Sequence, residues 1–413
     1  MTLPLEAAGP PGSQEFDPRN FDHHDAVQMG DAHSEIYRVL RERCPVAHSE
    51  QHEGFWVISR SADCFEAAQD WHRFSSAGGV TLPKVSGPMP FIPIEIDPPA
   101  LTRYRRLLLP HFSPASLAPM EPAIRAFTAQ CVERLAANGA GDLVAELATP
   151  VPMYAICRLL GVPEKDREEL HAWGASLAHG PAASGDDLDG ALEAATNLLV
   201  YLAEMIQERR EGRVKGNDLI SVMCVMEDEG GALSDDEILS IAFLLLPAGF
   251  DTTEAGIAGS LLYLAEHQDV QQALASDLSL VTTAVEELLR YESPVQAVHR
   301  VLTTDTTFRG QKLQKGESVL LLFGSANRDP AEFATAEAVD ITRVWNRHFA
   351  FGVGMHRCLG ANLARMELRI VLEELLTRYR FEPTVSHSEM KRVPGHIRGL
   401  ESLPAKIERR EGH

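Results

Sequence analysis

The longest apolar segment of the chain lies between residues 234 and 268. It begins with Ser234-Asp235-Asp236-Glu237, which has the form of a capping box, where a serine hydroxyl and a glutamate three residues later bind free backbone N–H groups at a helix start. The letters that follow, ILSIAFLLLPAGF, are apolar on every side, as is typical of a helix buried through a protein core. The pattern predicts a helix of roughly 32 residues, about 48 Å long, from Ser234 to about Gln268.

Five residues interrupt this apolar helix with a different chemistry: Pro247, Gly249, Asp251, Thr252 and Thr253. Proline removes one backbone hydrogen bond and glycine weakens the turn, while buried hydroxyls and carboxylates cost free energy unless they are partnered. Because such violations concentrate at functional sites, this part of the helix is a candidate site.

The rest of the chain predicts further helices and a few short strands, so the expected fold class is mainly α with a small β-rich portion. Helical spacing occurs at 101–112, 122–139 and 285–294, and strand-like runs at FWVIS, VHRVL, TTFRG and ESVLLLF. Two helical segments between residues 166 and 212 flank HGPAASGDD, and the pair is either a lid or an ordinary surface hairpin. In the second segment, one face should lie on the protein body, formed by Leu192, Ala195, Leu199, Leu202 and Ile206.

Domain organisation follows from composition along the chain. Residues 1–20 are rich in proline, glycine and acids and are predicted to form a flexible N-terminal arm, whereas 21–413 should form a single catalytic domain. The stretch from Gly78 to Pro99 contains too many prolines for a long regular element.

Charge and cysteine content exclude several classes of function. The 59 acidic and 38 basic residues give a net charge of −21, which disfavours nucleic acid or an anionic membrane as a partner. The six cysteines form no CxxC pair, and the N-terminus lacks the pattern of a signal peptide. We therefore expect a cytoplasmic protein, monomeric and without a membrane segment.

Cys358 is the cysteine with the most informative surroundings. It lies where a glycine-rich loop meets the last long helix, and the free N–H groups at that helix start should lower its pKa and favour the thiolate that a soft metal or haem iron prefers. Gly352, Gly354 and Gly360 would allow the backbone to fold closely around the sulfur. The alternative is a buried, inert cysteine.

The whole string from Phe351 to Gly360, FGVGMHRCLG, resembles the haem-binding loop of the cytochrome P450 superfamily at every defining position. Three further features precede it in the family's order, namely AGFDTT at 248–253, ELLR at 287–290 and DITR at 340–343. The resemblance covers residues 30 to 405. It implies the cytochrome P450 fold, with the long central helix over the haem, haem b as cofactor, and monooxygenase activity with O2.

The resemblance also implies roles for individual residues. Cys358 is similar to the thiolate ligand of the iron, and Phe351, Gly352 and Gly360 to the loop around it. The buried ion-pair network of the family corresponds to Glu287, Arg290 and Arg343, and the haem-propionate ligands to Arg105, Arg300 and His356. Leu101 stands where many relatives have a histidine, so propionate binding should be weaker or differently shared.

Asp251 and Thr252 resemble the family's acid–alcohol pair for proton delivery. Because the pair is intact, we expect use of O2 with two electrons and two protons rather than of peroxide. A hydroxyl that only hydrogen-bonds to the preceding turn is the alternative for Thr252. Pro247 is unusual so close to the pair and should deepen a local kink.

No dinucleotide-binding glycine motif accompanies the haem domain, so a separate ferredoxin and its reductase are the implied partners. Four arginines could form a basic patch for an acidic partner, namely Arg103, Arg106, Arg357 and Arg365. The alternative is that they are ordinary solvated surface charges.

The family pattern also predicts a mainly apolar substrate pocket, formed by Met89, Phe91, Leu244, Pro247, Ala248, Gln296 and Ile397. Gln296 would supply a single hydrogen bond to the substrate. The stretch FIPIEIDPP resembles that of bacterial terpenoid hydroxylases, which makes a terpenoid the first choice, with aromatic, steroid and polyketide substrates open. The rivals are a peroxide-using or rearranging enzyme on the same scaffold and a haem-based ligand sensor.

Overall fold

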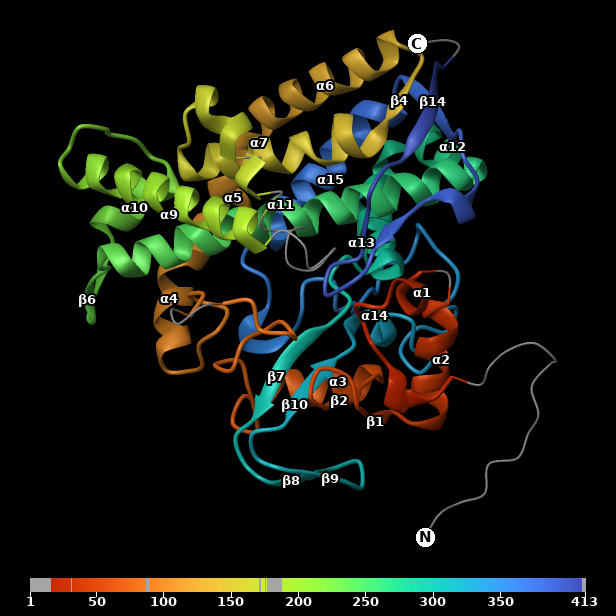
Figure 1. Cartoon of the computed structure of the whole chain (residues 1–413). Helices are drawn as coiled ribbons and strands as arrows, with labels where there is room; N and C mark the ends of the chain where they lie inside the picture. The colour runs from red at the N-terminus through yellow and green to blue at the C-terminus, as the bar shows by residue number, and fades with distance from the viewer. Residues whose placement is uncertain are drawn as a thin grey trace.

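The computed structural model describes residues 16–30, 32–86, 90–170, 172–174, 176 and 188–410. A helix-rich layer forms one side of the molecule, and the main β-sheet with α2 and α3 forms the other (Figure 1). This arrangement confirms the expected fold class, mainly α with a small β-rich portion.

The described helices pack mostly around one long member. Their bounds are α1 (Ala26–Met29), α2 (His33–Arg43), α3 (Ser61–Gln69), α4 (Ala100–Leu108), α5 (Pro114–Leu117), α6 (Glu121–Ala137), α7 (Pro150–Leu160), α9 (Leu188–Arg210), α10 (Leu219–Val225), α11 (Asp235–Glu266), α12 (Gln268–Ser276), α13 (Val281–Glu292), α14 (Phe323–Ala326) and α15 (Ala361–Leu376).

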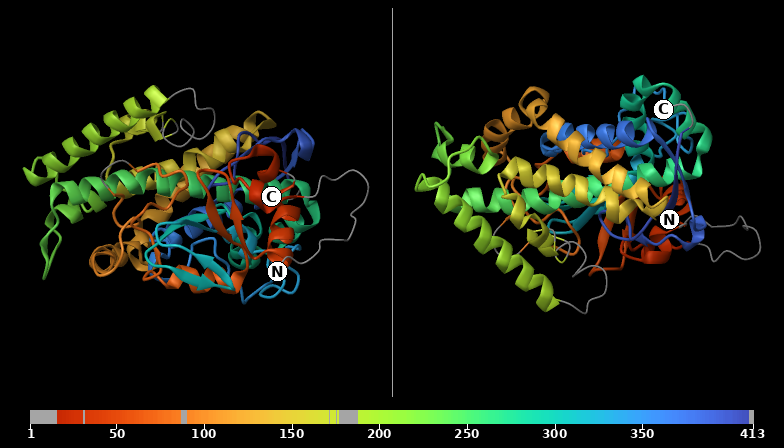
Figure 2. Two further views of the ribbon diagram at one scale, coloured as in Figure 1. Left: turned by 60° about the horizontal axis from the view of Figure 1, so that its bottom comes forward. Right: turned by 90° about the horizontal axis from the view of Figure 1, so that it is seen from above.

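The central helix α11 confirms the sequence prediction for its length and its start. Ser234 caps it, and Ser234 and Glu237 form both hydrogen bonds of a capping box. The helix runs beside α7, α9, α13 and α15, and Figure 2 shows α9 lying along one end of it. In the described part of the chain, α11 is a helix long and apolar enough to cross a membrane by length and composition alone. Half of that apolar window is buried inside the protein.

The main sheet has five strands in the order β1-β2-β10-β7-β3. The strands are β1 (Val46–Ser49), β2 (Phe55–Ile58), β3 (Phe74–Ser75), β7 (Val298–Leu302) and β10 (Ser318–Leu321). β10 is parallel to β2 and antiparallel to β7, with Leu320 opposite both Val57 and His299. Because β10 is central, its residues from Val319 to Leu321 are fully buried, as expected for a continuous apolar strand.

The remaining described strands form small sheets that close the edges of the fold. A three-stranded sheet has the order β11-β14-β4, and three two-stranded sheets pair β5 with β6, β8 with β9 and β12 with β13. Their bounds are β4 (Ala140–Asp142), β5 (Glu227–Asp228), β6 (Gly231–Ala232), β8 (Thr306–Phe308), β9 (Gln311–Leu313), β11 (Tyr379–Pro383), β12 (Arg392–Val393), β13 (Gly399–Leu400) and β14 (Pro404–Arg409).

Two local predictions need correction. The body-facing side of α9 is formed by Ala191, Ala194, Leu198, Leu202 and Ile206, whereas Leu192, which was assigned to that face, is exposed. The preceding stretch HGPAASGDD lies outside the described residues.

Residues 17–20, which were included in the predicted flexible N-terminal arm, are also folded. Residues 1–15 lie outside the described part, but Pro18–Asn20 form a short 3₁₀ helix beside β1. The Glu50 N–H donates to the Arg19 carbonyl oxygen, and the Ser49 hydroxyl donates to that of Phe21. Residues 17–21 therefore belong to the folded body. The assignment of 21–413 to one domain stays a prediction.

Candidate functional site

The loop before α15 bends sharply around Cys358. Gly352 and Gly354 both have positive φ angles, 62° and 70°, a conformation that glycine adopts without steric cost. The Cys358 N–H donates to the carbonyl oxygen of Phe351 at 2.8 Å, which closes the loop. The Cys358 side chain is exposed, whereas the other cysteines are buried or half-buried.

The surroundings of the Cys358 sulfur have opposing effects on its pKa. Burial is the largest influence and raises the pKa, while a hydrogen bond from the Gly360 N–H and the charges of Arg105, Arg357 and Arg365 lower it. Because burial outweighs the hydrogen bond and the three charges, the pKa of the Cys358 thiol is raised. The expectation of a lowered pKa is therefore wrong. The sulfur is accessible yet desolvated, so it faces a space that the protein encloses. A bound metal ion would stabilise the thiolate there.

Two arginines and a histidine surround this loop and have spare hydrogen-bond donors. The Arg105 side chain makes no hydrogen bond or ion pair with any described residue, although it interacts electrostatically with Cys358. Among the described residues, the buried Arg300 side chain donates only to the carbonyl oxygen of His299, its sequence neighbour, at 2.7 Å. His356 Nε2 is buried without a hydrogen-bond partner.

Electrostatics link these three side chains. Burial, together with the charges of Arg300 and Arg105, lowers the pKa of His356 to about 3. Burial lowers the pKa of Arg300 to about 10, so the guanidinium stays charged at neutral pH. Asp97 is the nearby carboxylate, with 4.0 Å between its Oδ1 and His356 Nε2. The group is thus suited to bind a further anion, and the resemblance correctly placed its members together.

Leu101, the departure from the family pattern, lies on α4 one turn before Arg105. It is buried and contributes apolar surface to the core. It therefore offers no donor to an anion at this group, and weaker or differently shared propionate binding stays a prediction.

Glu287 and Arg290 are fully buried at the centre of a second network. Arg290 donates to both of its carboxylate oxygens, each at 2.9 Å, and Arg343 Nε donates at 3.0 Å. The sequence did not reveal two further donors, the Asn346 side-chain amide and the Asp340 N–H, each at 2.9 Å. The network joins α13 to the chain segment that leads into the Cys358 loop. The predicted trio is therefore brought together as expected.

An accessible stripe lies along the otherwise buried middle of α11. Leu244, Pro247, Asp251 and Thr252 are partly exposed and Ala248 is exposed, although Leu246 and Phe250 beside them are buried. The positions are three or four residues apart, so they share one face of the helix. This face is not covered by other described side chains. Pro247 lies inside the helix without interrupting it, so the expected kink does not break α11.

The polar residues of this stretch are held in an apolar environment. Burial, and to a smaller extent the charge of Glu254, raises the pKa of Asp251 well above its ordinary value. Burial also raises the pKa of Glu254 to about 7, against a hydrogen bond from Thr149. The sequence analysis missed Glu254, although an acid three residues after Asp251 in a buried helix was a visible signal.

The Thr252 hydroxyl donates to the carbonyl oxygen of Ala248 at 2.7 Å. This is the hydrogen bond to the preceding turn that the sequence left open as an alternative. The oxygen of the hydroxyl retains its acceptor sites, so the geometry is compatible with a proton relay as well.

Of the predicted pocket residues, Phe91 lies beside the accessible stripe of α11, and Ile397 lies in the loop between β12 and β13. The ring of Phe91 lies 5.9 Å from that of Phe243 on α11, and the next residue, Ile92, donates its N–H to the Ser240 hydroxyl. Ile397 pairs with Val295 in an isolated β-bridge. Met89 lies outside the described residues.

Gln296 does not have the predicted role. Its side-chain oxygen accepts a hydrogen bond from the Tyr37 hydroxyl at 2.8 Å, and its amide nitrogen donates to the carbonyl oxygens of Glu292 and Ser293. Because the amide is fully buried and occupied by these partners, it is not free to orient a substrate.

The predicted basic patch is largely neutralised. Arg103 forms ion pairs with Asp228 and Glu237, and Arg106 pairs with Asp228 as well. Arg365 donates to both carboxylate oxygens of Glu286, at 2.6 and 2.7 Å. The sequence could not show these partners because they lie far away in the chain. Arg357 is exposed, and its side chain makes no hydrogen bond or ion pair with the described residues.

An accessible cysteine under a long helix, with donors free for an anion beside it, defines a haem-thiolate site. The family model described as Cytochrome P450 matches residues 184–408. Cytochrome P450 130 of Mycobacterium tuberculosis (strain ATCC 25618 / H37Rv) is 36% identical over 355 residues, which cover 83% of this chain and 87% of that relative. The chain belongs to the cytochrome P450 family.

Two further relatives agree. Vitamin D(3) 25-hydroxylase of Pseudonocardia autotrophica is 34% identical over 381 residues, covering 89% of this chain and 92% of that enzyme. The structure of cytochrome P450 CYP109Q5 from Chondromyces apiculatus has a TM-score of 0.86 and 30% identity, covering 96% of this chain and all of that one. The protein is therefore a cytochrome P450 monooxygenase with haem b as its cofactor.

The residues present fit haem. Cys358 offers an accessible sulfur for the iron. The unpartnered Nε2 of His356 and the spare N–H groups of Arg105 and Arg300 match the carboxylates of the propionates.

Proposed function

We propose that this cytochrome P450 hydroxylates a compact hydrophobic substrate, with a terpenoid as first choice, and that a ferredoxin supplies the electrons. The accessible stripe of α11 carries the proposal. The apolar part of this stripe is formed by Leu244, Pro247 and Ala248. Its polar groups are the side chains of Asp251 and Thr252. A mainly apolar lining with few polar groups is typical of sites for small hydrophobic molecules.

Haem, when bound, supplies the reductive activation of O2 and the transfer of one oxygen atom to a C–H bond, while the other is reduced to water. Cys358 would bind the iron, with Phe351, Gly352 and Gly360 shaping the loop around the sulfur. The propionates would be held by Arg105, Arg300 and His356. The network of Glu287, Arg290 and Arg343 would keep the loop in position through buried hydrogen bonds.

Asp251 and Thr252 would handle the protons that the reaction consumes. The raised pKa of Asp251 means that its carboxyl group keeps its proton to a higher pH than an ordinary aspartic acid does, so it is suited to donate one. The Thr252 hydroxyl can exchange its hydrogen bond to Ala248 for a donation into the accessible space. This intact pair supports O2 as the oxidant over peroxide.

Replacement of Thr252 by Ala tests the proton assignment. In a system reconstituted with ferredoxin and reductase, we expect a larger share of the NADH electrons to appear as hydrogen peroxide and a smaller share as product. The matched control is Thr196→Ala, because the exposed Thr196 makes the same kind of hydrogen bond, to the Leu192 carbonyl oxygen at 2.8 Å, on α9. Equal coupling in both variants would contradict the assignment.

The substrate class rests on two observations beyond the apolar lining. The stretch FIPIEIDPP resembles that of terpenoid hydroxylases, and Ile92 within it is anchored on α11 through Ser240. The name of one relative, vitamin D(3) 25-hydroxylase, specifies a largely hydrocarbon substrate. Because Gln296 is occupied by Tyr37, we propose that shape rather than a glutamine hydrogen bond orients the substrate.

A spin-state titration distinguishes the substrate classes without the native reductase. The haem-loaded protein is titrated with a panel of terpenoids, steroids, macrolide polyketides and simple aromatics, and the shift of the Soret band is recorded. We expect saturable shifts at the lowest concentrations for cyclic terpenoids. Tighter binding of the polyketide or aromatic arm would overturn the terpenoid assignment.

A ferredoxin is the proposed electron donor, and a cytoplasmic location fits the six free cysteines. A hollow near the Cys358 loop is lined by Phe65, His348, Phe351 and Arg357, among others. Arg357 is the cation of the predicted patch that keeps no carboxylate partner among the described residues. We expect Arg357→Glu to raise the KM for ferredoxin, and Arg106→Glu, which loses only its contact with Asp228, to raise it less.

A further inference from the structure

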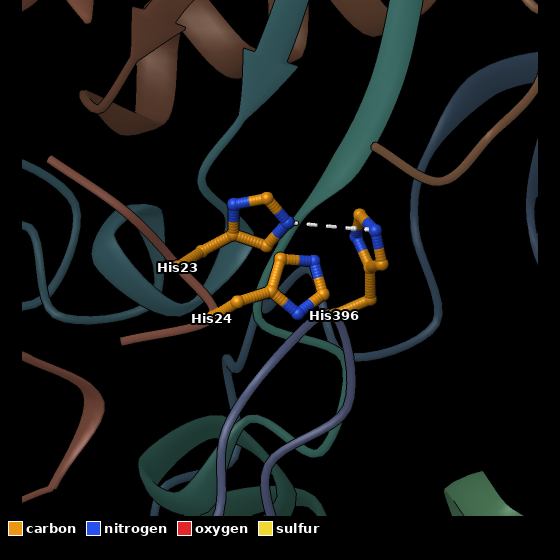
Figure 3. A group of neighbouring side chains, drawn as sticks. All are labelled: His23, His24 and His396. Atoms are coloured by element: carbon orange, nitrogen blue, oxygen red, sulfur yellow. Dashed lines mark hydrogen bonds between the residues drawn. The ribbon is translucent and has the colours of Figure 1, made fainter. Parts of the chain in front are cut away.

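Four histidines from three distant parts of the chain meet at the edge of the main sheet. His23 and His24 lie just before α1, His52 lies in the turn between β1 and β2, and His396 lies between β12 and β13. Figure 3 shows His23, His24 and His396 with their rings turned toward one another. The centroid of the His23 ring lies 4.2 Å from that of His24 and 4.6 Å from that of His396.

The hydrogen bonds of this cluster leave buried ring nitrogens without partners. His396 Nε2 accepts from the Leu82 N–H at 2.7 Å, so the proton of that neutral ring lies on Nδ1, which is buried and unpartnered. His23 Nε2 lies 3.4 Å from His396 Nε2, and His23 Nδ1 is also buried without a partner. Buried polar atoms of this kind cost free energy, which a ligand could recover.

The spacing of the rings matches a metal site. The three side chains each offer a ligand atom within 4.8 Å of the others. Two imidazole nitrogens bound to tetrahedral Zn²⁺ at about 2.1 Å lie about 3.4 Å apart. The observed separation between His23 Nε2 and His396 Nε2 is 3.4 Å.

We propose that His23, His24 and His396 bind a divalent transition-metal ion, with zinc as the ion that fits the geometry, at a site separate from the haem. Burial lowers the pKa of His23, and lowers that of His396 to about 3, so both rings are neutral, the form that binds metals. His24 Nε2 lies 2.9 Å from the Leu82 carbonyl oxygen, to which it donates, so Nδ1 is the nitrogen of the neutral His24 ring that is free to bind an ion.

The Nε2 atom of a neutral His396 ring has one lone pair, which accepts the hydrogen bond from the Leu82 N–H. To bind a metal ion through Nε2, His396 must give up this hydrogen bond. Leu82 begins the stretch that leads to Phe91. His396 precedes Ile397, and its carbonyl oxygen accepts from the Gln296 N–H at 2.7 Å. The ion would thus connect the N-terminal segment to two loops that carry proposed pocket residues. This consequence rests on the proposed function, whereas metal binding itself does not.

Metal analysis of the whole holoenzyme tests the proposal. The protein is purified without a histidine tag, stripped with a chelator, and dialysed against a zinc buffer that holds free Zn²⁺ at about 1 μM. Zinc and iron are then counted per chain by mass spectrometry, so that iron reports haem loading independently. We expect one zinc per chain in the natural sequence, and at least tenfold weaker zinc binding in His24→Ala and in His396→Ala.

Two matched variants make the assignment specific. His72→Ala removes an exposed histidine outside the cluster and should keep the full zinc content. His52→Ala should keep it too, because His52 belongs with Asp22 to a neighbouring group that shares only His23. Loss of zinc in His52→Ala with retention in His396→Ala would overturn the assignment. So would equal zinc contents in the natural sequence and His24→Ala.

A spectroscopic readout avoids the risk that a variant folds poorly. X-ray absorption at the zinc edge of the natural holoenzyme should show imidazole scattering from three nitrogens at about 2.0–2.1 Å. Oxygen ligation without imidazole scattering would overturn the proposal. Because this signal does not depend on turnover, failure of the proposed function and failure of the metal site are distinguished.

Discussion

Two groups of buried acids in this enzyme have opposite electrostatic properties. Glu287 is fully buried, and burial would raise its pKa, but hydrogen bonds from Arg290 and the Asp340 N–H, with the charges of Arg290 and Arg343, lower it. Asp251 and Glu254, on α11, have no cationic partner, and burial raises the pKa of both. The difference in partners, rather than in burial, decides whether the carboxyl group is charged.

The contrast separates structural acids from those that can exchange protons. A carboxylate locked by two guanidinium groups cannot gain a proton without breaking the network, so Glu287 is suited to hold the fold together. An unpaired acid in an apolar helix changes its protonation near neutral pH at little structural cost. Variants of the two groups should therefore separate stability from turnover.

The largest effect on stability is expected for Glu287→Gln. The change leaves Arg290 and Arg343 charged without a carboxylate in the protein interior, which costs about 3–5 kcal/mol. We expect a strongly lowered unfolding midpoint and loss of haem from the purified protein. Denaturant unfolding followed by fluorescence, together with the Soret absorbance per chain, measures both. A midpoint equal to that of the natural sequence would show that the network is not needed for folding.

Asp251→Asn should have the converse effect. Because no cation loses its partner, stability should be unchanged or higher, whereas removal of a proton donor should lower kcat by about 10²–10⁴-fold. Turnover with a saturating substrate and thermal unfolding of the same preparation give the two values. A variant with normal kcat would remove Asp251 from proton delivery.

Glu254→Gln should change how stability depends on pH. Folding raises the pKa of Glu254 from an ordinary value of 4.5 to about 7, so between these pH values the folded state holds a proton that the unfolded state has lost. Stability from this group therefore falls as pH rises from about 4.5 to 7 and is constant above that. The upper limit of the effect is about 3 kcal/mol, since one pKa unit corresponds to about 1.4 kcal/mol.

Unfolding free energies of the natural sequence and of Glu254→Gln, measured from pH 5 to pH 8, test this sign. The natural protein should lose stability relative to the variant as pH rises. Parallel curves would show that Glu254 has the same pKa in both states. Asp269→Asn, which changes an acid at the start of α12, is the control for the general effect of charge.

Local patterns predicted α11 and the Cys358 loop because their information is local. The capping box at Ser234 and the glycines around Cys358 specify backbone geometry within a few residues. The spacing of Glu287 and Arg290 on one helix likewise indicated a pair. These features need no knowledge of the rest of the fold.

Long-range contacts account for what the sequence did not reveal. Gln296 is occupied by Tyr37, which lies 259 residues away, and Arg103 is neutralised by Asp228, 125 residues away. No local pattern specifies such partners, because they depend on how the sheet and helices come together. The pKa of Cys358 was misjudged for a similar reason, since burial is a property of the assembled fold.

The smallest effect on stability is expected for Arg38→Ala, which tests an exposed ion pair against the buried one of Glu287. On α2, Arg38 forms ion pairs with Glu35 at 2.5 Å and with Glu42 at 2.6 Å, both shorter than the contacts of Glu287 with Arg290. About half or more of each side chain is exposed, however, so water screens the charges and each pair contributes less than about 1 kcal/mol. The denaturant midpoint should therefore hardly change, although Glu287→Gln removes a longer interaction with a severe effect. A large destabilisation by Arg38→Ala would mean that distance, and not burial, determines what an ion pair contributes in this protein.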